Sequence, residues 1–355
     1  MATTRRTWLQ AVGVGGTAAA LSGCVSAPSA DYGENAMTER RAVEDAKTPT
    51  VDRVAADPTD VPAPITRSSP ATVDVTLRPE EVTAEIEDGV TFDYMTYNGQ
   101  VPGPMVRVRQ GDTVNLTFEN PEGNVMPHNV DFHAVAGPGG GAGATLTSPG
   151  ETKTLSFKAT YPGAYIYHCA VPNLDMHISA GMFGIILVEP PEGLPEVDHE
   201  VYLGQNEIYT DTPAGEAGHH RFDMASMIRE DPTYVVMNGE KYAIGGRWDP
   251  VNVKTGETVR VYFVVGGPNL TSSFHPIGSV WDEYWPQGSL TTSPQTHIQT
   301  WPVAPGSTAI ATMSSPVPGD FKLVDHALSR VARKGVMAIV HADGPENPEI
   351  FNPGG

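Results

Sequence analysis

The residues of this chain best suited to metal chemistry gather in one short segment, YHCAVPNLDMHISAGM, at positions 167–182. The segment contains Cys169, one of only two cysteines in the 355 residues, together with His177 and Met182. His128 lies upstream, in MPHNVDFH. Two imidazoles, one thiolate and one thioether form the ligand set of a blue-copper ion. These four residues are therefore predicted to bind one copper.

Two other interpretations of the same residues stay open. Zinc is the competing metal, although structural zinc sites more often contain paired cysteines and rarely a methionine. A buried cysteine packed beside hydrogen-bonded histidines, without any metal, is the structural alternative. If Cys24 is lipidated, Cys169 is the only thiol left, and no intrachain disulfide can form.

The nearby histidines predict a second site on the opposite face of the same strands. Successive side chains of a strand point to opposite faces, so His168 faces away from Cys169. His133 is an odd number of residues from His128 and also faces the other way, whereas Asp131 shares the parity of His133. We expect the second group to contain Asp131, His133 and His168, unless a bulge within HNVDFH changes the alternation. The peptide bond between the two neighbours would then link two metals.

Short strands must position these side chains. The runs ATVDVTL, VTFDYMTY, DTVNLTF and AYIYHC are separated by turn sequences such as NPEGN and SPGE. A second set, including TYVVMNG, ETVRVYFVV and STAIATM, follows the proline-rich linker EPPEGLPEVDHE. The pattern predicts an all-β chain of two tandem Greek-key β-sandwiches with few short helices. HALSRVARKG is the best helical candidate.

The N-terminal segment is predicted to direct export and is excluded from the fold. Paired arginines, a short apolar stretch and LSGC resemble a Tat-type signal with a lipobox that ends at Cys24. The expected organisation is a signal over 1–24, a disordered tether over 25–72, an N-terminal domain over 73–192 and a C-terminal domain over 198–345. The protein is expected at the cell surface or in a periplasm-like space, attached to a membrane only through a lipid on Cys24.

The composition limits the partners. Acidic residues outnumber basic ones 42 to 22, and the net charge of -20 argues against binding to nucleic acid or to anionic membranes. The acidity indicates a halophilic source, with an acidic mesophilic secreted protein as the alternative. His219 and His220 are expected to lie in a solvated segment between the domains.

Several motifs, taken in chain order, resemble the copper-containing nitrite reductases. They are MPHNVDFHA, GPGGGAG, FKATYPGAYIYHCA, HISAGM, FHPIG and VDHAL, and they span about residues 75–340. The resemblance implies a homotrimer whose subunits each contain two cupredoxin domains, one type 1 copper and one type 2 copper. It also implies dissimilatory reduction of nitrite to nitric oxide, with electrons from a small blue-copper protein or a cytochrome.

The same resemblance assigns roles to individual residues. The type 1 ligands would be His128, Cys169, His177 and Met182. The type 2 ligands would be His133, His168 and, from the neighbouring subunit, His326. The residues that bind the bridging water and deliver protons would be Asp131 and His275, the latter supported by Thr300. Ile277 would shape the nitrite pocket.

Two other copper functions remain as alternatives. A multicopper oxidase would need His-X-His pairs and a His-Cys-His strand, whereas Ala170 follows Cys169 and Asp131 stands where a further histidine would be needed. A non-enzymatic blue-copper electron-transfer protein would leave the type 2 histidines without a role. Counting coppers distinguishes them, since a carrier would hold one per chain and the reductase two. A structural surface lipoprotein, the remaining alternative, would show no colour.

Overall fold

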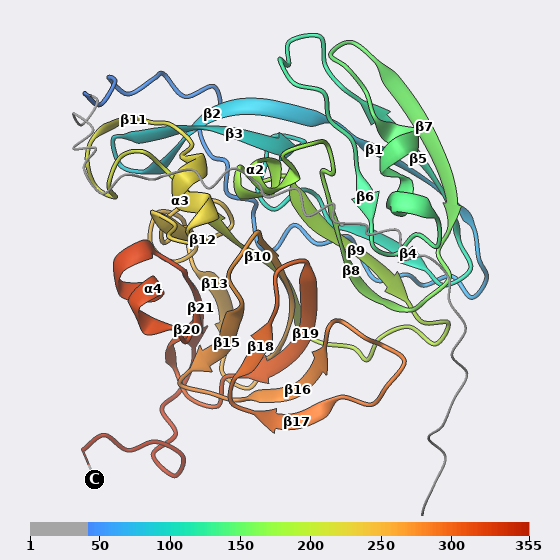
Figure 1. The fold of residues 1–355 in the computed structure, drawn as a ribbon. Coiled ribbons are helices and arrows are strands. Elements are labelled where there is room, and N and C mark those ends of the chain that lie inside the picture. Colours follow the sequence, from blue (N-terminus) through green and yellow to red (C-terminus); the bar gives the residue numbers. More distant parts are fainter. Residues whose placement is uncertain (1–41, 355) are drawn as a thin grey trace, which may run out of the picture. The chain divides into compact units, whose positions relative to one another are not determined.

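The structure, a computed structural model, describes residues 42–354. The predicted signal at 1–24 and the tether up to residue 41 lie outside the described residues. Regular structure in the described part is almost entirely β, as Figure 1 shows. No helix in residues 42–354 is long and apolar enough to cross a membrane.

The strands and helices have the following bounds. The first half contains β1 (Thr72–Leu77), β2 (Pro79–Glu87), β3 (Val90–Tyr97), β4 (Val106–Arg109), β5 (Thr113–Glu119), β6 (Asp131–Phe132), β7 (Thr152–Lys158), β8 (Gly163–His168) and β9 (Phe183–Glu189). The second half contains β10 (His199–Ile208), β11 (Gly218–His220), β12 (Tyr234–Met237), β13 (Val251–Lys254), β14 (Thr258–Gly267), β15 (Ser272–Ile277), β16 (Trp281–Pro286), β17 (Gln295–Ile298), β18 (Trp301–Val303), β19 (Ser307–Ser314), β20 (Gly319–Asp325) and β21 (Met337–Asp343). The helical turns are the 3-10 helix η1 (Pro138–Gly141), α1 (Ala142–Thr145), α2 (Leu174–Ser179), α3 (Met224–Ile228) and α4 (Leu328–Lys334).

Two sheets of the first half share one core. Their strand orders are β1-β5-β7 and β4-β9-β8-β6. Strand β5 shows why they form, because Val114, Leu116 and Phe118 are buried and alternate with more exposed residues. Strand β4 is parallel to β9 although four other strands, β5 to β8, lie between them in the chain, so the connection crosses from one sheet to the other and back.

The second half repeats this arrangement. A six-stranded sheet of order β12-β10-β14-β19-β16-β17 packs against a five-stranded sheet of order β13-β21-β20-β15-β18. Val261 and Phe263 of β14 meet Phe274 of β15 and Leu323 of β20 in their common core. The predicted fold class, two β-sandwiches with few short helices, is confirmed, and α4 forms within the predicted helical segment.

Strand β9 is buried on both faces and thereby fixes its neighbour β8. Ile186 and Val188 point into the core of the first sandwich. Phe183, Ile185 and Leu187 point the other way, into a separate core that includes residues of β2, β3, β10 and β14. Because β8 pairs with β9 along its whole length, its alternate side chains also enter two different environments.

The segment from residue 43 onward departs from the expected disordered tether over 25–72. Val54 and Ala55 are buried, and their backbone amides both donate to Glu240 Oε1 at 3.0 Å. The sequence of this segment shows no strand periodicity because the segment is not a strand of a sheet. Single hydrogen bonds such as those to Glu240 anchor it instead. The domain limits 73–192 and 198–345 stay predictions.

His219 and His220 also differ from expectation, because they lie in β11 and not in a solvated segment. Both side chains are buried. β11 pairs with β3, and His219 Nδ1 lies 3.2 Å from Thr91 Oγ1 while its Nε2 lies 3.3 Å from a carboxylate oxygen of Asp93. Local composition did not predict this pairing, since β3 is far away in the sequence.

Candidate metal centres

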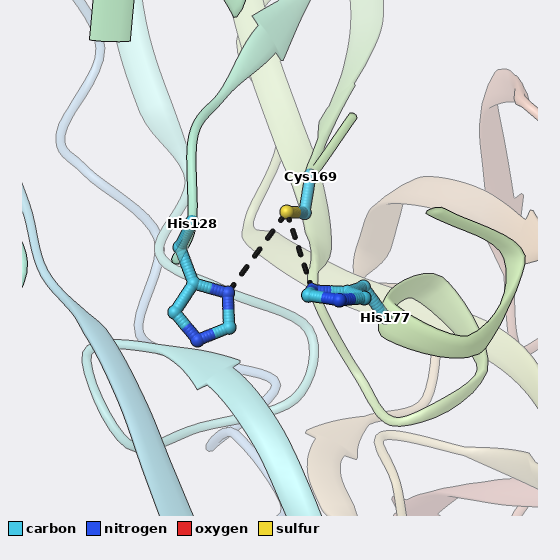
Figure 2. Close-up of side chains that lie close together, drawn as sticks. All are labelled: His128, Cys169 and His177. Carbon is cyan, nitrogen blue, oxygen red and sulfur yellow. Dashed lines mark hydrogen bonds between the residues drawn. The ribbon is translucent and has the colours of Figure 1, made fainter. Parts of the chain in front are cut away.

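The first group of donor atoms surrounds Cys169, the residue that follows β8. Cys169 Sγ lies 3.5 Å from His177 Nδ1 and 4.0 Å from His128 Nδ1, as Figure 2 shows. All three side chains are buried, and their ligand atoms lie within 4.8 Å of one another. Helix α2 carries His177, and the chain then returns so that the carbonyl of Met182 accepts from the amide of Cys169 at 3.2 Å. Met182 is buried in the same core.

The electrostatics of this group suit a bound cation. Burial raises the pKa of the Cys169 thiol and lowers the pKa of His177 to about 4. Both shifts favour the neutral forms, so a positive charge is needed before the thiolate becomes the stable form. His177 Nε2 is buried and has no hydrogen-bond partner among the described residues. A soft metal between the two Nδ1 atoms and Sγ fits this donor set.

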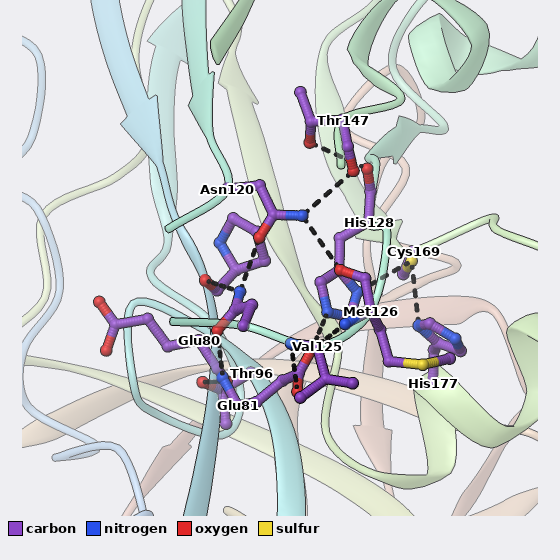
Figure 3. A network of polar contacts seen from close by, with 12 residues as sticks. Glu80, Glu81, Thr96, Asn120, Val125, Met126, His128, Thr147, Cys169 and His177 are labelled. Carbon is purple, nitrogen blue, oxygen red and sulfur yellow. Dashed lines mark hydrogen bonds and ion pairs between the residues drawn. The ribbon is translucent and has the colours of Figure 1, made fainter. Parts of the chain in front are cut away.

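Two residues beside this group were not predicted from the sequence. Glu81 of β2 lies 3.1 Å from His128 Nε2, and Figure 3 shows its carboxylate beside Val125 and Met126, whose backbone amides donate to it. Desolvation raises the pKa of Glu81, but hydrogen bonds from His128 and from the amides of Met126 and Val125 outweigh it, and the net pKa is lowered. Asn129 Oδ1 accepts from the amide of Ala170 at 2.7 Å and lies 3.6 Å from Cys169 Sγ.

Only one of these two had a signal in the sequence. Asn129 follows His128 directly, so its position beside a candidate ligand was visible. Glu81 is 47 residues away from His128, and no spacing rule connects them.

The second group contains Asp131, His133 and His168, whose ligand atoms also lie within 4.8 Å of one another. His133 Nε2 lies 3.1 Å from His168 Nε2, with ring planes at 78°. His168 Nδ1 donates to the carbonyl of Cys169 at 2.9 Å, which leaves its Nε2 directed at His133. Burial, followed by the neighbouring His168, lowers the pKa of His133. Two facing imidazoles next to a carboxylate are a donor set for a divalent metal.

The alternation of strand faces explains why the two groups separate. Asp131 of β6 pairs with His168 of β8, and Phe132 pairs with Tyr167. Phe132 and Tyr167 enter the core of the first sandwich, in common with Cys169. Their neighbours in the chain, Asp131, His133 and His168, therefore point to the opposite face.

The glycine-rich segment lies against Asp131. Gly140, in η1, has a φ of 54°, and a Cβ added there would lie 1.8 Å from Asp131 Oδ1. Only glycine adopts this backbone conformation without strain and also leaves room for the Asp131 carboxylate. The segment therefore limits where the Asp131 side chain can lie.

The remaining predicted site residues form a separate patch on the second sandwich. The rings of His275 in β15 and His326 after β20 lie 5.0 Å apart, centroid to centroid. His275 Nδ1 donates to the carbonyl of Gln299 at 2.5 Å and lies 3.4 Å from Thr300 Oγ1. Ile277, at the end of β15, is 38% exposed.

His326 is exposed. Neither His275 nor His326 belongs to the group of described residues that contains Asp131. One chain therefore brings together two of the three histidines predicted for the type 2 site, and leaves His326 elsewhere.

Known proteins similar to this chain are copper proteins. A family model described as multicopper oxidase matches residues 79–193. A copper-containing nitrite reductase of Neisseria meningitidis serogroup A is 47% identical over 303 residues, which cover 85% of this chain and 78% of the relative. One of Cereibacter sphaeroides is 35% identical, covering 81% and 80% of the two chains.

Solved structures agree with these relatives. The copper nitrite reductase of Nitrosomonas europaea superposes with a TM-score of 0.69 at 35% identity, covering 78% of this chain and 96% of that chain. A multicopper oxidase superposes with a TM-score of 0.65 at 28% identity, covering 81% and 95%. The oxidase likeness extends to the fold, but Ala170 after Cys169 does not supply the histidine that a His-Cys-His strand requires.

Proposed function

This chain belongs to the family of copper-containing nitrite reductases, and we propose that it reduces nitrite to nitric oxide at two coupled copper sites. The observation that carries the proposal is the separation of the neighbours His168 and Cys169 into two donor groups. One peptide bond joins the groups, so an electron has a short covalent route from the buried group to the other. Each turnover consumes nitrite, one electron and two protons, and releases nitric oxide and water.

One donor set suits electron transfer, and the other suits the binding of nitrite. Copper held by His128, Cys169, His177 and Met182 would exchange one electron, and copper held by His133, His168 and a third histidine would offer nitrite an open coordination position. Burial of Cys169 keeps water away from the electron-transfer group. The hydrogen bond from His168 Nδ1 to the Cys169 carbonyl orients the shared histidine.

Two side chains would handle the protons: Asp131 of the second group and His275 of the separate patch on the second sandwich. A carboxylate oxygen of Asp131 lies within reach of both histidines and can hold a proton for an oxygen atom of nitrite. His275 donates through Nδ1 to the Gln299 carbonyl, and its Nε2 can hold the second proton. Ile277, on the same strand as His275, would contribute an apolar surface.

We propose that the third histidine, His326, comes from the neighbouring subunit of a homotrimer. His326 is exposed and does not belong to the group around Asp131, which supports a position at a subunit interface. A neighbouring chain that presents the pair of His275 and His326 to that group would supply a third imidazole and a second proton carrier together. The complete site would then exist only between subunits.

The cellular setting is proposed from the sequence. Export by a Tat-type signal and lipid attachment at Cys24 rest on residues outside the described part of the chain. The electron donor would be a small blue-copper protein or a cytochrome, and nitrite reduction would serve denitrification. The acidic composition supports a halophilic source.

The decisive experiment measures nitric oxide formed from nitrite by the copper-loaded protein. His133→Ala is expected to abolish nitric oxide production and to lose one copper per chain, while the thiolate-copper absorption of the Cys169 group remains. His341→Ala is the matched control, because His341 is paired with Asp320 and belongs to neither group. A His133→Ala variant as fast as the parent would refute the assignment, and a parent with a single copper and no nitric oxide would favour an electron carrier.

A further inference from the structure

We propose that Glu81 is a positioning residue for the Cys169 centre: its carboxylate holds the ring of His128 with Nδ1 turned towards Cys169, and so sets the redox properties of the metal bound there. The inference rests on the proposed electron-transfer copper. It adds a strand of another sheet, β2 in the sheet β11-β3-β2, to the parts that build this centre.

The contacts of the Glu81 carboxylate determine which ring nitrogen of His128 carries the proton. Oε1 lies 2.7 Å from the amide of Met126 and 3.1 Å from His128 Nε2, and Oε2 lies 3.0 Å from the amide of Val125. The two amides can only donate, so the carboxylate acts as the acceptor throughout. His128 Nε2 therefore carries the ring proton, and the lone pair of Nδ1 faces Cys169 Sγ.

The backbone of His128 is held independently of Glu81. Its amide and carbonyl pair with the carbonyl and amide of Thr147 at 3.0 and 2.9 Å, and Thr147 Oγ1 also donates to the His128 carbonyl. The preceding loop is held by Asn120, whose side-chain amide donates to the carbonyls of Met126 and Thr147 at 3.1 Å each. Figure 3 shows these contacts around one ring. The remaining freedom of His128 is rotation of its ring, and the contact of Nε2 with Glu81 restrains that rotation by hydrogen bonding.

The two imidazoles of the centre differ in this respect. His128 has a carboxylate partner on Nε2, whereas His177 Nε2 is buried without a partner in the described part of the chain. A carboxylate on the far nitrogen of a ligand histidine raises the basicity of the ring. Greater basicity stabilises the oxidised metal more than the reduced metal. Glu81 is therefore expected to keep the reduction potential low.

The test compares Glu81→Gln with two controls in the full-length, copper-loaded protein. Glu80→Gln removes the same charge from the adjacent residue, which is partly exposed and, by the alternation of side chains along β2, faces the other side of the strand. Asn124→Ala loosens the same loop without touching the ring, because Asn124 bonds the amide of Glu81, the carbonyl of Pro79 and Asn120. The readouts are copper content, the thiolate-copper absorption band and the reduction potential from a redox titration.

Glu81→Gln is expected to raise the reduction potential, with a roughly tenfold shift of the one-electron equilibrium, or about 59 mV. Copper affinity at the Cys169 centre should fall roughly tenfold or more. Both controls should keep the parental band and potential. If Glu81→Gln matches the parent, or if Glu80→Gln shifts the potential equally, the carboxylate does not act through the ring and the inference is wrong.

Failure of the proposed function is a distinguishable result. A parent protein without a thiolate-copper band would overturn the copper assignment itself, whatever the variants do. Should Glu81→Gln not fold, as judged by circular dichroism, Glu81→Asp tests the same contact, because it keeps the charge and withdraws the carboxylate by one methylene. Lower copper affinity in Glu81→Asp supports the inference, and parental affinity and potential contradict it.

Discussion

At the scale of single residues, the position of Asp131 depends on a glycine on another segment. Gly140→Ala would add a Cβ 1.8 Å from Asp131 Oδ1 and would strain a backbone with φ of 54°. The carboxylate must then move, and displacement of a catalytic group by about 1 Å can cost on the order of 100-fold in rate. We expect nitrite turnover to fall at least tenfold on this basis, with both coppers retained.

The matched control for this change is Gly143→Ala. No heavy atom lies within 4 Å of a Cβ added at Gly143. Turnover close to the parental rate is expected for the control, measured as nitric oxide production alongside copper content. Equal rates for Gly140→Ala and the parent would show that Asp131 is not held by the glycine-rich segment.

Asp131 itself is proposed to move a proton and not to bind metal. Asp131→Asn keeps the size of the side chain but cannot accept and release a proton, so turnover should fall by roughly 100-fold or more. Both coppers should remain, because the ligand histidines are unchanged. Metal analysis together with a nitrite assay checks this, and loss of copper would show a structural role.

At the scale of elements, Glu240 is one of the residues that attach the segment from residue 43 to 71 to the sandwiches. Its carboxylate accepts from the amides of Val54 and Ala55 and also bonds Arg247 and Trp248. Glu240→Ala would leave the buried amides of Val54 and Ala55 without an acceptor, a loss of about 3 kcal/mol in the free energy of unfolding. Urea unfolding measures that loss, and limited proteolysis should cut near Val54 in the variant before it cuts the parent. An unchanged cleavage pattern would show that other contacts anchor the segment.

The buried His219 of β11 makes the free energy of unfolding depend on pH. Burial lowers the pKa of His219 even though Asp93 acts in the opposite direction. The unfolded chain therefore binds this proton first as the pH falls, and the free energy of unfolding decreases below about pH 6.5, the ordinary value for histidine.

His219→Gln removes this titrating group. Between about pH 7 and pH 5, the free energy of unfolding of the variant should decrease less steeply than that of the parent. Urea unfolding of both copper-free proteins at several pH values measures the two slopes. Parallel slopes would mean that the proton is bound equally well in the folded and unfolded states.

At the scale of the whole molecule, the proposed trimer can be tested by complementation. His133→Ala and His326→Ala should each be inactive alone. If one active site takes His133 from one subunit and His326 from its neighbour, co-expression should restore intact sites at about a quarter of the parental number in a random closed ring. Nitric oxide production per copper-loaded protein measures the recovery. Inactive mixed assemblies would place both histidines in the same subunit's site.

The sequence by itself was sufficient for the fold class and for the grouping of donor residues. Alternation along one strand is a local property, so the separation of His168 from Cys169 could be derived from their adjacency. The same rule placed Asp131 with His133, and the structure brings both to His168. The resemblance of short motifs added the family, which the relatives confirm.

Only the tertiary structure decided what surrounds those donors. Glu81 reaches His128 from another sheet, and Gly140 limits Asp131 from a neighbouring loop. The burial of Val54 and of His219 likewise follows from distant partners and not from local composition. A strand pattern records which face a side chain takes, whereas the identity of the group opposite that face is set by packing between segments far apart in the chain.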